Sequence, residues 1–156
     1  MEIAFIKTPL GVAKIAGDDN GIAVISILEE GEVTTEVPVL LQEAISQLND
    51  YFVGNRNDFD FKMNPSGTEF QQRVWQELLN IPFGKTMSYL DLSKKLGDVK
   101  AIRAVASANG KNPLWIVVPC HRVIGTDGSL TGYAGGLWRK KWLLEHESPS
   151  AQQSLF

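Results

Sequence analysis

Cys120 is the residue whose type and neighbours predict nucleophilic chemistry in this chain. It stands in the tetrapeptide Pro119-Cys120-His121-Arg122, at the end of an apolar run. The thiolate is the reactive form of cysteine, and neighbouring cationic or proton-accepting side chains favour it. Because Pro119 ends the apolar run, we expect the thiol at a turn or at the edge of a site. The histidine beside it could accept its proton.

Two carboxylates near the end of the chain, Glu145 and Glu147, are candidates for orienting that histidine. If Cys120 and His121 lie on extended backbone, their side chains point to opposite faces, and a water molecule is a reasonable link between them. The order carboxylate, imidazole, water and thiol indicates an activated thiol and leaves the substrate open. The alternative is that Cys120 is an inert buried residue, as most lone cysteines are.

The composition excludes several classes of protein. A single cysteine cannot form an internal disulfide, and one cysteine with two histidines cannot assemble a zinc site of the usual spacing. No apolar run approaches the roughly 18 residues that cross a bilayer. The start of the sequence lacks the basic and apolar regions of a secretory signal. We therefore expect a cytoplasmic protein that binds no metal and needs no cofactor.

Charge is unevenly distributed along the chain, whose net charge is −3. Residues 1–65 carry 4 Lys and Arg against 11 Asp and Glu, whereas residues 66–147 carry 11 against 7. This asymmetry is what a DNA-facing half and an indifferent half would show, and chance scatter of surface charge is the alternative. We divide the chain into domains at 1–65 and 66–147, followed by a polar tail at 148–156.

The first domain is predicted to contain a small antiparallel sheet and one helix. Turn residues separate three β-type runs, Ile3–Lys7, Val12–Ile15 and Ile22–Leu28, which predict a meander. Apolar residues at helical spacing predict an amphipathic helix over residues 38–52. The alternation of Phe59, Asp60 and Phe61 predicts a further short strand.

The second domain is predicted to be mostly helical. Thr68-Glu69-Phe70-Gln71 has the pattern of a capping box, and Ser88 can cap a short helix that ends before Gly97. With a second short helix over residues 100–109, this makes a helix-turn-helix candidate. Residues 115–118 are predicted as a strand leading to Pro119, and a final helix is predicted over residues 137–147.

Several motifs along this second domain agree with one known family. They are Phe70-Gln71-x-x-Val74-Trp75, Ile81-Pro82-Phe83-Gly84-x-Thr86, Ser88-Tyr89, Arg103-Ala104-Val105, Asn112-Pro113, Pro119-Cys120-His121-Arg122-Val123 and Gly132-Tyr133-x-Gly135-Gly136-Leu137. In these motifs and their order, the chain from Thr68 to Glu147 resembles the O6-alkylguanine-DNA alkyltransferase family. The resemblance argues against an inert cysteine.

The resemblance implies an α/β (α+β) protein. Its N-terminal domain would be ribonuclease H-like with an antiparallel sheet, and its C-terminal domain mostly helical with a helix-turn-helix of winged-helix type. The implied activity is single-use repair of double-stranded DNA, in which the alkyl group of O6-alkylguanine, with O4-alkylthymine as a further candidate substrate, passes to the protein. The damaged base would be extruded from the duplex while a monomer binds the minor groove.

The resemblance also implies roles for five residues at the reaction centre. Cys120 matches the alkyl acceptor and His121 the base that acts through water. Glu147, rather than Glu145, matches the carboxylate partner of that histidine. Asn112 matches the asparagine that holds the turn between the recognition helix and the active-site strand. Tyr89 matches the tyrosine that helps to rotate the nucleotide and donates a proton toward the leaving guanine.

Further matches concern DNA and the base pocket. Arg103 matches the arginine that fills the gap in the base stack, with the small residues Ala104 and Ser107 beside it on the helix that approaches DNA. The base pocket is assigned to three residues: Tyr133 lines it, the backbone N–H of Ala134 faces the guanine O6, and Val123 completes it.

The chain departs from the family pattern in two places, and three other functions compete. Many relatives have Tyr where Phe83 stands, and others have Ser where Ala134 stands. An alkyltransferase-like protein that only binds damage is the strongest rival, and the intact Cys120 argues against it. A transcription factor with a helix-turn-helix leaves residues 119–123 unexplained. A cysteine hydrolase would turn over, which a stable thioether cannot do.

Overall fold

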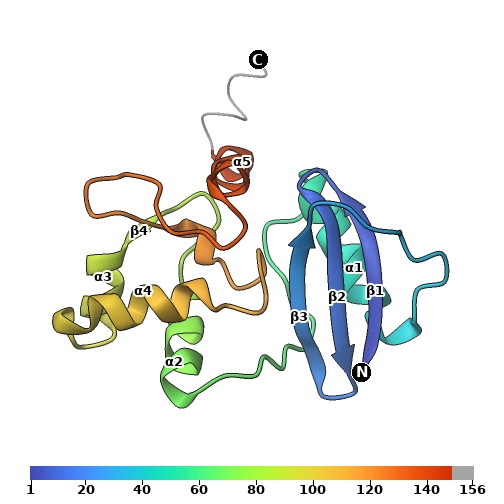
Figure 1. Ribbon diagram of the computed structural model, residues 1–156, viewed down its shortest axis with the longest axis horizontal. Helices are drawn as coiled ribbons and strands as arrows, with labels where there is room; N and C mark the ends of the chain where they lie inside the picture. Colours follow the sequence, from blue (N-terminus) through green and yellow to red (C-terminus); the bar gives the residue numbers. More distant parts are fainter. Residues whose placement is uncertain (149–156) are drawn as a thin grey trace. The chain divides into compact units, whose positions relative to one another are not determined.

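The computed structural model describes residues 1–148 and divides into two compact units (Figure 1). The first unit consists of Met1–Ser66 together with Pro113–Val117. The second consists, within the described residues, of Gly67–Asn112 and Val118–Ser148. Apart from Ser148, the polar tail expected at 148–156 lies outside the described residues.

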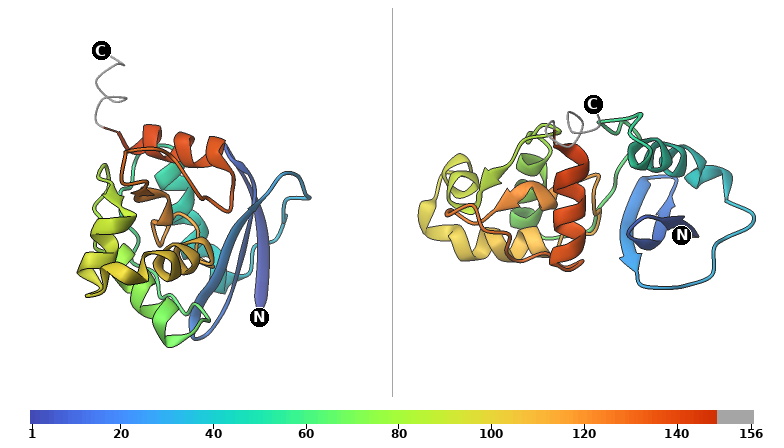
Figure 2. Two further views of the ribbon diagram at one scale, coloured as in Figure 1. Left: turned by 60° about the vertical axis from the view of Figure 1, so that its left-hand side comes forward. Right: turned by 90° about the horizontal axis from the view of Figure 1, so that it is seen from above.

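The first unit is a three-stranded antiparallel sheet with one helix packed against it (Figure 2). Its elements are β1 (Glu2–Thr8), β2 (Gly11–Asp18), β3 (Gly21–Leu28) and α1 (Val39–Phe52). The strands pair in the order β1-β2-β3, as the predicted meander requires. Leu41 and Leu48 of α1 are fully buried, as is Ile15 of β2, so helix and sheet share one apolar core.

The free edge of β3 is met by two segments that are far apart in the sequence. Ile22 N–H donates to Lys62 O at 2.9 Å, and Ile25 N–H donates to Pro113 O at 2.8 Å. Each contact is an isolated parallel bridge rather than a strand pair. Short contacts of this kind cover backbone donors and acceptors that an edge strand would otherwise leave open to another chain.

These contacts explain why two predicted strands are wrong. Residues 59–61 form no strand: the ring centroids of Phe59 and Phe61 lie 6.0 Å apart, and Asp60 N–H donates to the Gln47 side chain at 3.1 Å. Residues 115–118 form turns, and Ile116 takes a φ of 75°. In each segment pairing with β3 does not extend beyond a single bridge, at Met63 and at Leu114, and within 115–118 only Trp115 N–H bonds to the strand, at Ile25 O.

The second unit contains four helices, two single-turn helices and two very short strands within the described residues. They are α2 (Glu69–Leu78), β4 (Met87–Ser88), α3 (Tyr89–Lys95), η1 (Val99–Ala101), α4 (Ile102–Gly110), η2 (Cys120–Arg122), β5 (Val123–Ile124) and α5 (Leu137–Glu147). β4 and β5 pair in parallel. The mixed α/β fold with an antiparallel N-terminal sheet and a helical C-terminal part is thus confirmed.

Local signals place the helices that carry the site. Thr68 and Gln71 form the predicted capping box of α2, and the Ser88 hydroxyl accepts from Asp91 N–H at the start of α3. Gly97 has a φ of 91°, the left-handed conformation that ends a helix without strain for glycine. Trp75 of α2 donates from Nε1 to Ala108 O of α4 at 2.9 Å, which anchors the second helix of the helix-turn-helix pair.

None of the helices in residues 1–148 combines the length and the apolar character that a bilayer crossing requires.

Candidate active site

The thiol lies on a tight turn and not on extended backbone. Cys120, His121 and Arg122 form the 3-10 helix η2, which Pro119 precedes. Arg122 N–H donates to Pro119 O at 3.0 Å and closes the turn. All three side chains of η2 are buried. The opposite-face arrangement considered for an extended Cys120 and His121 therefore does not apply.

Glu147, the last residue of α5, joins the histidine and the arginine of this turn. Its Oε2 lies 2.8 Å from His121 Nε2, and its Oε1 accepts from Arg122 Nε at 2.8 Å. Arg122 Nη2 adds a third contact at 3.0 Å, and its Nη1 donates to Ile81 O at 2.7 Å. Glu147 is 2% exposed. Burial alone would raise its pKa, but the bonds from His121 and Arg122 hold that pKa at about 2.

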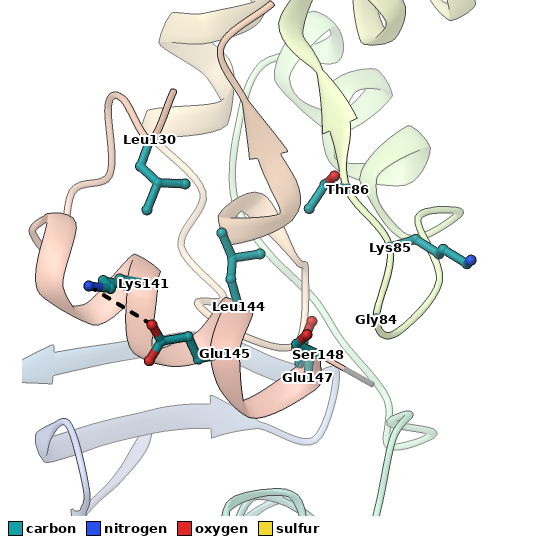
Figure 3. Close-up of a pocket in the computed structure, with 9 residues that line it drawn as sticks. All are labelled: Gly84, Lys85, Thr86, Leu130, Lys141, Leu144, Glu145, Glu147 and Ser148. Carbon is teal, nitrogen blue, oxygen red and sulfur yellow. Dashed lines mark ion pairs between the residues drawn. The ribbon is translucent and has the colours of Figure 1, made fainter. Parts of the chain in front are cut away.

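Glu145 takes no part in this arrangement. Figure 3 shows it directed toward Lys141 of the same helix, 3.9 Å away across a solvent-exposed pair. Glu145 and Glu147 both line a pocket of about 410 Å³, together with Thr86 and Leu144. Of the two carboxylates that the sequence offered, the structure brings Glu147 to the histidine.

The geometry fixes the state of His121. Burial lowers its pKa, and this outweighs the neighbouring Glu147 carboxylate, so the ring is neutral at pH 7. Since Glu147 is ionised, the single ring proton belongs on Nε2, where the carboxylate accepts it. Nδ1 then carries a lone pair, and this buried atom has no hydrogen-bond partner among residues 1–148. His121 is therefore arranged as a proton acceptor at Nδ1.

Cys120 is a neutral thiol in this environment. Burial raises its pKa to about 11, and the Asn112 side chain and the Lys140 ammonium offset only part of that rise. A cation, Lys140, does favour the thiolate, but burial outweighs it and the resting sulfur keeps its proton. Arg122, the nearest cation in sequence, directs its donors to Glu147 and Ile81. A base is thus needed to remove the proton before the sulfur can react.

Asn112 connects this turn to the end of α4. Its Nδ2 donates to Val118 O at 2.7 Å, and the residue is 3% exposed. The bond fixes the backbone immediately before Pro119, so it positions Cys120 through the turn.

Tyr89, the first residue of α3, is the next residue of the candidate site. Its hydroxyl lies 3.3 Å from Asn109 Nδ2 and 3.5 Å from Gly132 O. Burial raises the pKa of this phenol, while the Asn109 bond lowers it. A pocket of about 330 Å³ is lined by Tyr89 together with Arg103 and Gly132. The structure thus brings Tyr89 and Arg103 to one cavity.

The residues assigned to DNA contact lie on the solvent side of α4. Arg103, Ala104 and Ser107 are all exposed. Val105 on the same helix is fully buried. The helix therefore turns a face of small residues and one arginine to solvent, as an element that approaches DNA closely requires.

The three residues assigned to the base pocket differ in their surroundings. Tyr133 is half-buried, and the desolvation of its phenol raises the pKa well above the usual range. Ala134 is exposed in the loop before α5. Val123 is fully buried, and its carbonyl accepts from Lys140 Nζ at 2.6 Å.

Sequence reasoning missed three polar residues of the site. Arg122 was considered a neighbour of the thiol, whereas it holds Glu147. Asn109 contacts Tyr89, and Lys140 joins β5 to the following loop by donating to Val123 O and to Thr131 O at 2.8 Å. Lysine is almost never fully buried, so nothing in the α5 pattern signalled Lys140.

Within residues 1–148, no three His, Cys, Asp or Glu side chains come together as metal ligands would.

Comparison with protein families supplies two matches that together span nearly the whole chain. Residues 1–65 match the ribonuclease-like domain of 6-O-methylguanine DNA methyltransferase, and residues 69–149 match its DNA binding domain. A methylated-DNA–protein-cysteine methyltransferase of Methanosarcina acetivorans is 44% identical over 94% of this chain and 98% of its own length. A protein of the same name from Mycobacterium tuberculosis is 43% identical over 96% of this chain and 94% of its own.

Solved structures agree with these matches. The O6-methylguanine methyltransferase of Mycobacterium tuberculosis superposes with a TM-score of 0.84 at 41% identity, and 99% of each chain is covered. Mycobacterium tuberculosis OGT in complex with DNA superposes with a TM-score of 0.85 at 42% identity over the full length of both chains.

Proposed function

Because the chain belongs to the 6-O-methylguanine DNA methyltransferase family, we propose that it repairs DNA by direct reversal, transferring a methyl or other alkyl group from guanine O6 to Cys120. Relatives 41–44% identical over nearly the full chain carry the name methylated-DNA–protein-cysteine methyltransferase. The observation that carries the proposal for this chain is the buried thiol of η2 beside a neutral histidine whose Nδ1 is a free acceptor.

The reaction starts with removal of the thiol proton. His121 Nδ1 takes the proton of Cys120 through one water molecule, and Glu147 stabilises the imidazolium that forms. The sulfur then attacks the alkyl carbon in line with the bond to O6. The S–C bond forms as the C–O6 bond breaks, and the electron pair of that bond passes to the guanine. Arg122 keeps Glu147 ionised and in place during this change of charge.

Transfer is stoichiometric. A thioether has no good leaving group, and no residue of the site offers a route to hydrolyse it. Each molecule therefore reacts once, and the sulfur supplies all the chemistry without a cofactor. The activity is that of a methylated-DNA–[protein]-cysteine S-methyltransferase.

The substrate must leave the duplex before it can meet a buried thiol. Extrusion costs a few kcal/mol, and Arg103 offsets part of this by occupying the vacated place in the stack. Ala104 and Ser107 let α4 approach the minor groove closely. Tyr89 helps to rotate the nucleotide and donates a proton to the leaving guanine. The exposure of Arg103, Ala104 and Ser107 on α4 supports the first two assignments, and the cavity that Tyr89 of α3 shares with Arg103 supports the third.

The extruded base is received by the loop before α5. Tyr133 lines its pocket, the backbone N–H of Ala134 faces O6, and Val123 completes the pocket. We extend the proposal to O4-alkylthymine as a second substrate, to action as a monomer and to a cytoplasmic location. The single cysteine supports the last of these, since a reducing compartment keeps it as a thiol.

The test is a stoichiometry. Protein is incubated with an excess of duplex DNA containing O6-methylguanine, with a chelator present and no cofactor. We expect one methyl group per molecule, located by peptide mass spectrometry on the peptide that holds Cys120. More than one equivalent would make the protein a turnover enzyme, and unmodified protein on tightly bound DNA would make it a damage-binding protein.

A further inference from the structure

Asn109 is a buried amide near the end of α4, on the side of the helix that faces the site. It is 1% exposed, and its Oδ1 has no hydrogen-bond partner within residues 1–148. An apolar side chain at this position would carry no such desolvation penalty. The contribution of the residue must therefore come from its donor group, Nδ2.

That donor faces two oxygen atoms. Nδ2 lies 3.3 Å from the Tyr89 hydroxyl and 3.5 Å from Cys120 O. Turning the amide by half a rotation would set Oδ1 against Cys120 O, and two acceptors would then face each other with no proton between them. The structure accordingly has Asn109 presenting N–H, and not oxygen, to the phenol.

The orientation of Asn109 decides what the Tyr89 hydroxyl can do. Because the phenol oxygen accepts a hydrogen bond from Nδ2, its own proton must point elsewhere. The acceptor that it meets in the structure is Gly132 O at 3.5 Å, a long contact at the edge of the pocket that Tyr89 lines. A base in that pocket can replace so weak an acceptor.

We propose that Asn109 is a positioning residue that makes the Tyr89 hydroxyl the proton donor to the leaving guanine. The inference rests on the proposed function and extends it to a residue outside the acceptor, base and carboxylate set. As the C–O6 bond breaks, its electron pair passes to the guanine, which takes the Tyr89 proton. The phenolate so formed keeps its hydrogen bond from Nδ2 until solvent returns a proton, and the Cys120 proton remains on His121.

The chemistry of the pair supports this direction of transfer. An N–H donor stabilises a phenolate more than a phenol, so it strengthens the phenol as an acid. Burial raises the pKa of Tyr89, and the bond from Asn109 is the interaction that opposes this rise. Without it, the phenol would be a weaker acid at the moment when the guanine needs a proton.

A double-mutant cycle separates this role from simple packing. The rate of methyl transfer from duplex O6-methylguanine is measured in single turnover for the wild type, Asn109→Leu, Tyr89→Phe and the double variant. We expect Asn109→Leu to slow transfer about tenfold when Tyr89 is present and less than about twofold when its hydroxyl is absent. Equal slowing in both backgrounds, or none in either, would overturn the inference.

A second variant guards against a general loss of structure. Asn109→Asp keeps the shape of the side chain, but the ionised carboxylate has no proton to donate and instead accepts a hydrogen bond from the Tyr89 hydroxyl. Burial at this position raises the pKa of the introduced carboxyl group. The transfer rate, taken relative to the wild type at the same pH, should therefore be low at about pH 8 and rise as the pH is lowered, because the protonated carboxyl group can donate again. A rate with the same pH dependence as the wild type would contradict the proposal.

Ser93→Ala is the matched control. Ser93 is fully buried on α3 and its hydroxyl donates to the backbone carbonyl of Tyr89 at 2.9 Å, so it contacts the same residue without reaching the phenol. Its transfer rate should stay within about twofold of the wild type. If the wild type itself places no methyl group on Cys120, the proposed function fails. If it does and the cycle shows no coupling, only the role of Asn109 fails.

Discussion

The two units of the molecule differ in the polar groups that they bury. Among the described residues, the first unit buries two polar side chains, Thr8 and Gln47, beneath an otherwise apolar core. The second unit buries eight: Ser93, Asn109, Asn112, His121, Arg122, Arg139, Lys140 and Glu147. Both buried side-chain atoms that lack a partner within residues 1–148 belong to this second group.

The difference separates stability from chemistry. Burying a polar group lowers stability unless hydrogen bonds compensate, and burying a charge does so more strongly. The first unit avoids this cost. The second unit buries polar and charged side chains around Cys120 despite this cost, because the proposed reaction requires a neutral imidazole and an ionised carboxylate away from water. We therefore expect changes in the first unit to alter stability alone, and changes to the polar side chains that contact the functional groups of Cys120, His121 or Tyr89 to alter reactivity.

The largest effect is expected at the sulfur. Cys120→Ser should abolish methyl transfer, because a buried hydroxyl is a far weaker nucleophile than a thiolate. Affinity for DNA that contains O6-methylguanine should be retained, since the pocket is otherwise unchanged. Transfer is followed by mass spectrometry and affinity by fluorescence anisotropy. Methyl transfer by this variant would show that the acceptor lies elsewhere.

Glu147→Gln should be the next most damaging change. It leaves the Arg122 guanidinium buried without its counter-ion, which costs about 3–5 kcal/mol of stability. It also removes the charge that stabilises the protonated His121, so transfer should slow by about 10²–10⁴. Denaturant unfolding and single-turnover rates measure the two effects.

Glu145→Gln is the matched control for that experiment. Glu145 lies on the same helix, but its contact with Lys141 is exposed. Stability should change by less than about 1 kcal/mol and the transfer rate should not change. Similar losses for both glutamates would mean that the contacts of Glu147 with His121 and Arg122 are not required for the transfer.

Leu48→Ala tests the first unit. Leu48 is fully buried between α1 and the sheet, so truncation should cost about 2–5 kcal/mol through lost apolar contacts and the cavity left behind. The transfer rate of the molecules that remain folded should equal that of the wild type. A slower reaction in fully folded protein would break the separation between the two units.

The sequence predicted the elements whose signals are local. The capping box at Thr68, the cap at Ser88 and the left-handed Gly97 all depend on residues within one turn of each other, and the structure has each of them. Residues 59–61 and 115–118 look equally β-like in composition. Whether they become strands depended on the edge of β3, which a local pattern does not contain.

The candidate site divides in the same way. The motif Pro119–Val123 predicted Cys120 as the nucleophile and His121 as its base, and the family resemblance predicted the contact of Glu147, rather than Glu145, with that histidine, which the structure has. The ionisation of the thiol was not predictable, because its pKa depends on burial that the whole unit creates. Asn109 and Lys140 lie in helices. The apolar spacing of a helix predicts which face is buried, but it does not predict which hydrogen-bond acceptors of other segments that face will meet.

A smaller effect is expected from acid. The folded pKa of Glu147, about 2, lies below the usual 4.5. The unfolded chain therefore binds the proton more readily, and stability falls as the pH is lowered through this range. The shift corresponds to about 3 kcal/mol between pH 5 and pH 2. Urea unfolding of wild type and Glu147→Gln at several pH values measures it, and the variant should lack this part of the loss.

The smallest effect concerns the exposed face of α4. Arg103→Ala should slow repair of O6-methylguanine in duplex DNA about tenfold, because about 1.4 kcal/mol of the cost of extrusion is no longer offset. The rate of reaction with free O6-benzylguanine should be unchanged, since a free base needs no extrusion and Arg103 makes no contact with the His121–Glu147 pair. Lys100→Ala is the control: it removes an exposed positive charge at the same end of the helix without removing the wedge. Its rate on duplex DNA should recover when the salt concentration is lowered, because only phosphate attraction is lost, whereas the rate of Arg103→Ala should not. Equal slowing on duplex DNA and on the free base would instead assign Arg103 to the reaction centre. The proposed division of roles, in which the buried polar cluster performs the transfer and the exposed helix α4 binds the DNA, would then be wrong.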